Sequence, residues 1–183
     1  MTNGWTNYNL FQAAIQREAN MIEIEKMTEA AIPEIAPLVA QFRVTLKSFK
    51  GINASPKDNE GASELKEYLD AGFPVFAARS EGVFCGYMVC RVDEPCVWVE
   101  SIYVLPEFRR QGVAAALFCK AEELAAAYGE DTVYNYVHPN NNGIIAFLKS
   151  RGYTVLNLIE IRKPFTGEKL TRKIRVDENQ FDY

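Results

Sequence analysis

Apolar and polar positions follow two periods along the chain, and each change of period marks a new element. Between Met21 and Lys26, apolar and charged residues alternate as in a half-buried strand. Three longer apolar runs, rich in β-branched and aromatic residues, predict strands at Pro74–Ser80, Val83–Val92 and Val97–Leu105. Because only short turns separate these three strands, we expect them to form an antiparallel meander.

A helical period begins after the third of these strands. Apolar residues recur at helical spacing from Val113 onward, at Leu117, Ala121, Leu124 and Tyr128, before Gly129. Further helices are predicted after Thr28, at Ser63–Ala71 and at Asn141–Arg151, and further strands at Thr132–Val137, Tyr153–Ile161 and Lys169–Val176. The stretch from Gly51 to Ser63 is rich in Gly, Asn, Ser and Pro and is predicted to be a loop.

These elements together predict a mixed α/β fold of the α+β type. We expect one domain over residues 21–176, built on a twisted, mostly antiparallel central sheet of about six to seven strands with helices on both faces. Residues 1–20 form an N-terminal extension in this prediction, and residues 177–183 form a C-terminal tail. The length of 183 residues and the hydrophobic content of 48% suit one substantial core.

Charge and composition exclude several classes of protein. The net charge of −4 argues against a nucleic-acid partner, which would require a basic face. Charged residues interrupt the apolar runs before the roughly 20 residues that a spanning helix needs, and the N-terminus lacks an apolar signal core. We therefore expect a cytoplasmic protein with no membrane partner.

The four cysteines do not indicate a metal site. Cys85, Cys90, Cys96 and Cys119 lack metal-ligand spacing, and the chain has a single histidine, His138. We expect no metal and interpret the cysteines as small, reduced residues, with a nucleophilic cysteine as the alternative.

The most informative segment joins the strand that ends near Leu105 to the helix that begins at Val113. Backbone amides at a helix N-terminus are unpaired and carry the positive end of the helix dipole, so they bind phosphate groups. Gly112 permits close approach to the backbone, and Arg109 and Arg110 add positive charge. The segment therefore predicts an anion site.

Three kinds of phosphate-binding loop are possible there. A nucleotide-triphosphatase loop needs a second glycine followed by Lys and Ser or Thr, whereas Gly112 precedes Val113 and Ala114. A dinucleotide-binding turn needs three glycines, although Glu130 and Asp131 lie at about the distance of a ribose-binding acid. The remaining pattern is Arg/Gln-x-x-Gly-x-Gly/Ala.

That pattern, matched by Arg109, Gly112 and Ala114, resembles the pyrophosphate-binding motif of the GNAT (Gcn5-related N-acetyltransferase) superfamily. A downstream segment of that superfamily carries Asn, a short helix and then Gly followed by an aromatic residue. Asn141, Phe147, Gly152 and Tyr153 occupy this frame. The resemblance covers most of residues 21–163.

The resemblance implies a GNAT-like fold and acetyl-coenzyme A as the acyl-donating cosubstrate. It assigns the pyrophosphate to Arg109, Arg110, Gln111, Gly112, Val113, Ala114 and Ala115. Ile102, Tyr103 and Val104 would pair with the pantetheine arm through their backbone and offer an amide to the thioester oxygen. Asn141 would hydrogen-bond the cofactor, or cap the following helix, or both.

Glu100 is the candidate general base. It interrupts an otherwise apolar strand, where a carboxylate is costly unless it is paired or faces a cleft. The run from Val99 to Val104 is similar to the V/L-E-D-L-F/Y-V strand of polyamine-type acetyltransferases, whose Glu is the base. The alternative is a half-exposed glutamate that pairs with a nearby Arg or Lys.

The usual general acid of the superfamily is missing. Alignment on Asn141 and Gly152 places Leu148 where many members have a tyrosine. Tyr136 is our candidate acid, and Tyr134 and Tyr153 lie in nearby elements. Alternatively, the two tyrosines of the short strand pack there and the thiolate leaves unassisted.

These residues predict an N-acetyltransferase that transfers an acetyl group from acetyl-coenzyme A to a primary amine without a covalent enzyme intermediate. A small cationic amine is the favoured acceptor. A non-catalytic acyl-coenzyme A-binding module and a peptide or protein N-acetyltransferase are the alternatives, and a homodimer is possible.

Overall fold

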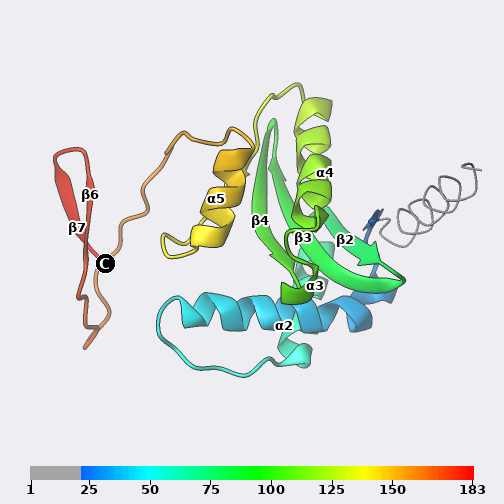
Figure 1. Ribbon diagram of the computed structural model, residues 1–183, viewed down its shortest axis with the longest axis horizontal. Helices are drawn as coiled ribbons and strands as arrows, with labels where there is room; N and C mark the ends of the chain where they lie inside the picture. Colours follow the sequence, from blue (N-terminus) through cyan, green and yellow to red (C-terminus); the bar gives the residue numbers. More distant parts are fainter. Residues whose placement is uncertain (1–21) are drawn as a thin grey trace, which may run out of the picture. The chain divides into compact units, whose positions relative to one another are not determined.

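The alternating apolar strands form a five-stranded sheet in the order β1-β2-β3-β4-β5 (Figure 1). The strands are β1 Glu23–Lys26, β2 Val75–Ser80, β3 Val83–Asp93, β4 Cys96–Val104 and β5 Tyr134–Asn135. Neighbours from β1 to β4 are antiparallel, and β5 runs parallel to β4. The meander predicted from the sequence is therefore present, and the fold is mixed α/β as predicted.

The structure is a computed structural model that describes residues 22–183. The predicted N-terminal extension, residues 1–20, lies outside the described residues. The chain separates into two compact units, of which the first ends at Ile144 and the second covers Ile145–Tyr183. No helix within residues 22–183 is long and apolar enough to cross a membrane.

Four α-helices and two short 3-10 turns accompany the strands in the described part of the chain. They are the turn Glu29–Ala31, α2 Ile32–Ser48, α3 Asp58–Asp70, the turn Pro106–Phe108, α4 Val113–Ala127 and α5 Asn142–Ser150. The helix α3 begins at Asp58, inside the segment predicted to be a loop. Asp58 and Glu60 lie in its first turn, where acidic side chains complement the helix dipole.

Gly61 also lies in the segment that was predicted to be a loop but belongs to α3. A Cβ atom at this position would lie 2.3 Å from the backbone oxygen of Ala36 in α2. The glycine therefore lets α3 approach α2 closely, and it is a packing residue rather than a loop residue. Arg43 of α2 and Glu64 of α3 add an ion pair across the same contact, with Arg43 Nε donating to Glu64 Oε2 at 2.7 Å.

Helices cover both faces of the sheet, as predicted. Tyr87 of β3 is fully buried in a cluster with residues of α2 and α3. Its neighbour Gly86 faces the other way, because a Cβ there would lie 3.2 Å from Val113 Cγ1 at the start of α4. Since successive residues of a strand point to opposite faces, α2 and α3 cover one face and α4 covers the other.

The second unit differs from the prediction. The segment Tyr153–Ile161, predicted to be a strand, forms none, and the predicted strand Lys169–Val176 is limited to β6 Lys173–Val176. The predicted tail instead forms β7 Asn179–Asp182, which pairs antiparallel with β6 in a separate sheet. The central sheet therefore has five strands where about six to seven were expected.

The sequence pattern of Tyr153–Ile161 was apolar enough for a strand, but a strand also needs a neighbour for its backbone hydrogen bonds. Tyr153–Ile161 has no such neighbouring strand in the described part of the chain, and several of its apolar side chains are exposed. The exposed apolar residues here and just downstream are Val155, Leu156, Leu158, Ile159, Ile161 and Phe165.

Candidate functional site

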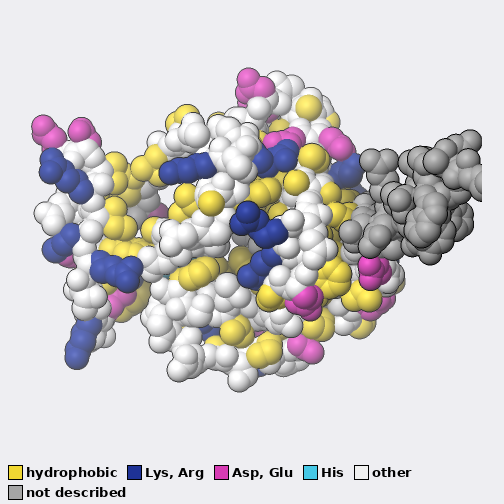
Figure 2. All heavy atoms as spheres, viewed as in Figure 1, with side chains coloured by type: hydrophobic (Ala, Val, Ile, Leu, Met, Phe, Trp, Pro, Cys, Tyr) yellow, Lys and Arg dark blue, Asp and Glu magenta, His cyan; other side chains and the backbone are white. Residues whose placement is uncertain are grey.

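The start of α4 presents unpaired backbone amides. The first hydrogen bond of this helical turn runs from the Ala116 amide to the Gly112 carbonyl (2.9 Å), and Gly112 provides no side-chain cap. The amides of Val113, Ala114 and Ala115 precede that bond and have no intrahelical acceptor. Figure 2 shows Lys and Arg side chains gathered beside the start of α4. The arrangement suits an anionic ligand.

Two left-handed residues shape the loop before α4. Arg110 has φ 64° and Gly112 has φ 90°. The side chains on either side of Arg110 are used within the protein: Arg109 Nε donates to the Val104 carbonyl at 2.9 Å, and Gln111 Nε2 donates to the Glu107 carbonyl at 2.8 Å. The first bond holds the loop against the end of β4 and the second closes the loop on its own turn, so the loop presents mainly its backbone and Arg110.

The strand β4 has an open edge next to this loop. It pairs with β3 from Cys96 to Val104, but β5 pairs only with Trp98 and Val99. Within residues 22–183, the backbone from Ser101 to Val104 therefore has no strand neighbour on the β5 side. Ile102, Tyr103 and Val104, predicted to pair with a pantetheine arm, lie along this edge.

Glu100 is the extra residue of a β-bulge. Val89 of β3 pairs with Ser101 and the next residue, Cys90, pairs with Val99, so Glu100 has no partner in the register. A bulge interrupts the ladder and redirects a side chain. Here it directs the carboxylate toward Arg91, whose Nε donates to Glu100 Oε1 at 2.6 Å.

Arg91 also pairs with Asp93, and its guanidinium lies 5.5 Å from the centre of the Trp98 ring. The hydrogen bond to Glu100 raises the pKa of Arg91 above its usual value. Glu100 is thus the ion-paired strand glutamate of the alternative prediction, and it also lines a pocket.

Tyr136, the candidate general acid, lies directly after β5. Its ring stacks on Trp98 with 4.8 Å between the ring centres, and Tyr134 stacks on the same indole at 4.7 Å. Tyr136 nevertheless remains 57% exposed. The packing predicted for the two tyrosines is present, and it leaves the Tyr136 ring accessible.

The loop after Tyr136 is fixed to the end of α2. The His138 ring stacks on Phe49 at 5.5 Å, and Asn140 Nδ2 donates to the Phe49 carbonyl at 3.1 Å. Burial, with a smaller contribution from the charge of Lys50, lowers the pKa of His138. Asn141 Oδ1 accepts a hydrogen bond from the Ile144 amide at 3.3 Å, which is the capping role predicted for it.

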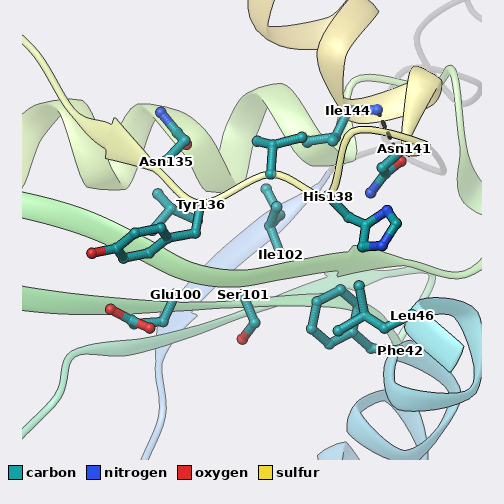
Figure 3. A pocket seen from close by; sticks show the side chains of 12 residues that line it. Phe42, Leu46, Glu100, Ser101, Ile102, Asn135, Tyr136, His138, Asn141 and Ile144 are labelled. Carbon is teal, nitrogen blue, oxygen red and sulfur yellow. Dashed lines mark hydrogen bonds between the residues drawn. The ribbon is translucent and has the colours of Figure 1, made fainter. Parts of the chain in front are cut away.

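These elements enclose a pocket of about 40 Å³ (Figure 3). Its lining residues come from α2, β4, the end of β5, the segment after β5 and the start of α5: Phe42, Leu46, Val99, Glu100, Ser101, Ile102, Asn135, Tyr136, Val137, His138, Asn141 and Ile144. Figure 3 shows the Tyr136 ring and the Glu100 carboxylate directed to the same side, away from His138 and Asn141. The pocket therefore brings together Glu100, Tyr136, Ile102 and Asn141 of the predicted site.

Two residues of this region were missed by sequence reasoning. Arg91 and Trp98 are direct cross-strand partners. The short turn between the predicted strands Val83–Val92 and Val97–Leu105 implied this pairing, because the register of a hairpin follows from its turn. The contact of Arg91 with Glu100 depends on the bulge, for which the sequence carried no signal, whereas β5 lies within the strand predicted at Thr132–Val137.

Leu148, which stands at the usual position of the acidic tyrosine, is buried in α5. The described residues contain no group of three or more His, Cys, Asp or Glu side chains that could hold a metal ion.

Comparison with known proteins gives a consistent picture. A model of the Acetyltransferase (GNAT) family matches residues 43–153. An uncharacterized N-acetyltransferase of Mycobacterium bovis is 31% identical over 99 residues, which are 53% of this chain and 64% of that protein. A probable N-acetyltransferase of Drosophila melanogaster, san, is 26% identical over 99 residues, covering 51% of this chain and 54% of that protein. The chain thus spans less than two thirds of the length of these relatives.

Solved structures share the fold. The aminoglycoside N-acetyltransferase AAC(6')-Iy in complex with CoA has a TM-score of 0.62 at 23% identity, covering 79% of this chain and 95% of that one. A ribosomal-protein-alanine N-acetyltransferase from Brucella melitensis biovar Abortus 2308 has a TM-score of 0.61 at 18% identity, covering 79% of this chain and 100% of that one.

Proposed function

The chain belongs to the acetyltransferase (GNAT) family, and from that premise we propose that it transfers an acetyl group from acetyl-coenzyme A to a primary amine. The carrying observation is that an open strand edge, Ser101–Val104, leads into a loop that ends at the N-terminus of α4. A backbone edge next to a cluster of unpaired amides suits a ligand with an amide-containing arm and a pyrophosphate.

The residues present fit such a donor. The amides of Val113, Ala114 and Ala115 would hold the pyrophosphate, and the exposed Arg110 would add charge. The β4 edge would pair with the pantetheine arm. Coenzyme A would supply the acyl group as a thioester, which an amine can attack directly.

Glu100 is the proposed base. Most alkyl ammonium groups titrate near pH of about 10.4, so an amine acceptor must lose a proton before it attacks. Arg91 occupies Glu100 Oε1, and among the described hydrogen bonds none engages Oε2. This second oxygen would receive the proton, directly or through water, while the new carbon–nitrogen bond forms and the carbon–sulfur bond breaks. Tyr136 is the proposed proton donor to the departing thiolate.

A small-molecule amine is the proposed acceptor. The aminoglycoside acetyltransferases among the proteins of similar fold support this class. The pocket volume of about 40 Å³ has room for an amino group.

The second candidate function is an acyl-coenzyme A-binding module without turnover. Two observations favour it: Leu148 is buried at the position where the resemblance to the superfamily would place a tyrosine, and Glu100 is already paired with Arg91.

Thermal unfolding with acetyl-coenzyme A, NAD or ATP, followed by thiol release with polyamines, amino acids and aminoglycosides, tests the proposal. A ligand that binds only the folded state at 100 times its Kd adds about 2.7 kcal/mol of stability. We expect this stabilisation with acetyl-coenzyme A and amine-dependent thiol release.

Glu100→Gln should lower kcat by roughly 10² to 10⁴ while acetyl-coenzyme A still stabilises the variant. Glu107→Gln, at an exposed position of the preceding turn, is the control and should keep full activity. Stabilisation without thiol release from any amine would favour the second candidate. Absence of stabilisation would refute the assignment of the loop.

A further inference from the structure

Three side chains form a row across the sheet beside the pocket. Arg91 of β3 pairs directly with Trp98 of β4, and Trp98 pairs directly with Tyr134 of β5. Paired residues share a face of the sheet. Tyr87 and Val89, earlier on the same face of β3, are buried with α2 and α3, whereas the Arg91 side chain is 26% exposed. The row therefore lies where burial under the two helices ends.

Tyr136 extends this row toward the pocket. Its plane lies within 15° of the Trp98 plane, so the ring is held in one orientation by stacking. A tyrosine that is 57% exposed and also held by stacking offers an ordered aromatic surface to a ligand. Tyr134, stacked on the same indole at 28°, supports the arrangement from β5.

The charges beside this aromatic surface favour a cation. Arg91 lies between two carboxylates, Glu100 and Asp93, and pairs with both. One positive and two negative groups leave a net negative charge, and Arg91 also interacts with Tyr136. Figure 3 shows the Tyr136 ring and the Glu100 carboxylate directed to the same side of the pocket. Aromatic faces and carboxylates both attract ammonium groups.

From this arrangement we propose that the acceptor is a primary amine attached to a ring, as in an amino sugar or a cyclic amine. The ring stacks on Tyr136 and the ammonium group binds Glu100. A linear amine of equal size satisfies the carboxylate but leaves the aromatic surface in water. This inference rests on the proposed transferase function and narrows its acceptor class.

Two amines with the same number of carbon atoms test it, cyclohexylmethylamine and n-heptylamine. We expect kcat/KM to favour the cyclic amine by roughly 3- to 10-fold, the range of a single aromatic contact. Tyr136→Leu should abolish this preference by raising KM for the cyclic amine. Tyr136→Phe keeps the ring and should keep the preference, even if loss of the hydroxyl lowers kcat for both amines.

Equal kcat/KM for the two amines, or a preference that survives in Tyr136→Leu, would overturn the inference. A binding measurement separates this failure from failure of the proposed function. The chain has two tryptophans, so Trp5→Phe leaves Trp98 as the sole indole. If no amine is acetylated, a saturable change in Trp98 fluorescence with cyclohexylmethylamine and not with n-heptylamine would retain the ring-binding site, and no change with cyclohexylmethylamine would reject it.

Discussion

Arg109 occupies a fixed position of the motif and Gln111 a variable one, and both side chains bind the protein itself. Arg109 donates to the Val104 carbonyl and also lies over the Tyr103 ring at 5.5 Å, so it joins the loop to the end of β4. Gln111 closes the loop on Glu107. At the scale of single residues, part of the motif therefore preserves the shape of the loop, and Arg110 is left to provide charge.

Substitution separates these two roles. Arg109→Ala should destabilise the protein by about 1 kcal/mol, because a hydrogen bond to the Val104 carbonyl is lost. It should weaken acetyl-coenzyme A binding by a similar factor at low and high salt. Arg110→Ala should leave stability unchanged and weaken binding mainly at low salt, because exposed charges are screened. Calorimetric titrations at two ionic strengths check this, and identical salt dependence in both variants would contradict it.

His138 predicts a pH dependence of stability. Burial lowers its pKa in the folded protein, so below pH of about 6.5 the unfolded chain binds more protons than the folded one. This contribution is fully present above that pH and is lost as the pH falls toward the lower folded pKa. His138 is the chain's only histidine. The free energy of unfolding of wild type, minus that of His138→Gln, should therefore decrease between pH 7 and pH 5 on denaturant titration. A constant difference would contradict the prediction.

At the scale of elements, β4 shows what a sequence pattern can and cannot predict. Its buried positions alternate without interruption through Val97, Val99, Ser101 and Tyr103, so the strand itself was predictable. Yet Val99 and Ser101 pair with adjacent residues of β3 and therefore lie on opposite faces. The bulge moves the buried side chains of β4 from one face of the sheet to the other, while buried and less buried residues still alternate along the sequence. For this reason the orientation of Glu100 toward Arg91 could not be predicted.

The contact between α2 and α3 is the element-scale feature most sensitive to substitution. Gly61→Ala would place a Cβ atom 2.3 Å from the Ala36 backbone oxygen. Separating the helices should cost about 1–3 kcal/mol of stability. Gly143→Ala is the matched control, because its nearest contact would be an ordinary 3.8 Å, and it should change stability by less than about 1 kcal/mol. Urea unfolding of both variants measures the difference. Equal stability of the two would show that α3 moves freely on α2.

At the scale of the whole molecule, family membership was predictable because the motif is local: Arg109, Gly112 and Ala114 lie within one short segment. The match of the family model confirms that prediction. The strand predicted at Tyr153–Ile161 was wrong for a non-local reason, since its pattern suits a strand but a ladder needs a partner. The pocket is likewise non-local, because it combines residues of α2 and β4 with residues from Asn135 to Ile144.

The contact at Gly61 also determines how the pocket can respond to an acceptor. α2 is held to α3 at Ala36 and again at Arg43, points separated by about 10 Å along the helix. Phe42 and Leu46, which form one wall of the pocket, lie beside the second point. A helix fixed twice resists both sliding and tilting, so this wall resists displacement by a wider molecule. Under the proposed function, acceptors should consequently be sorted here by steric exclusion, and Gly61, which does not line the pocket, would help to set the permitted width.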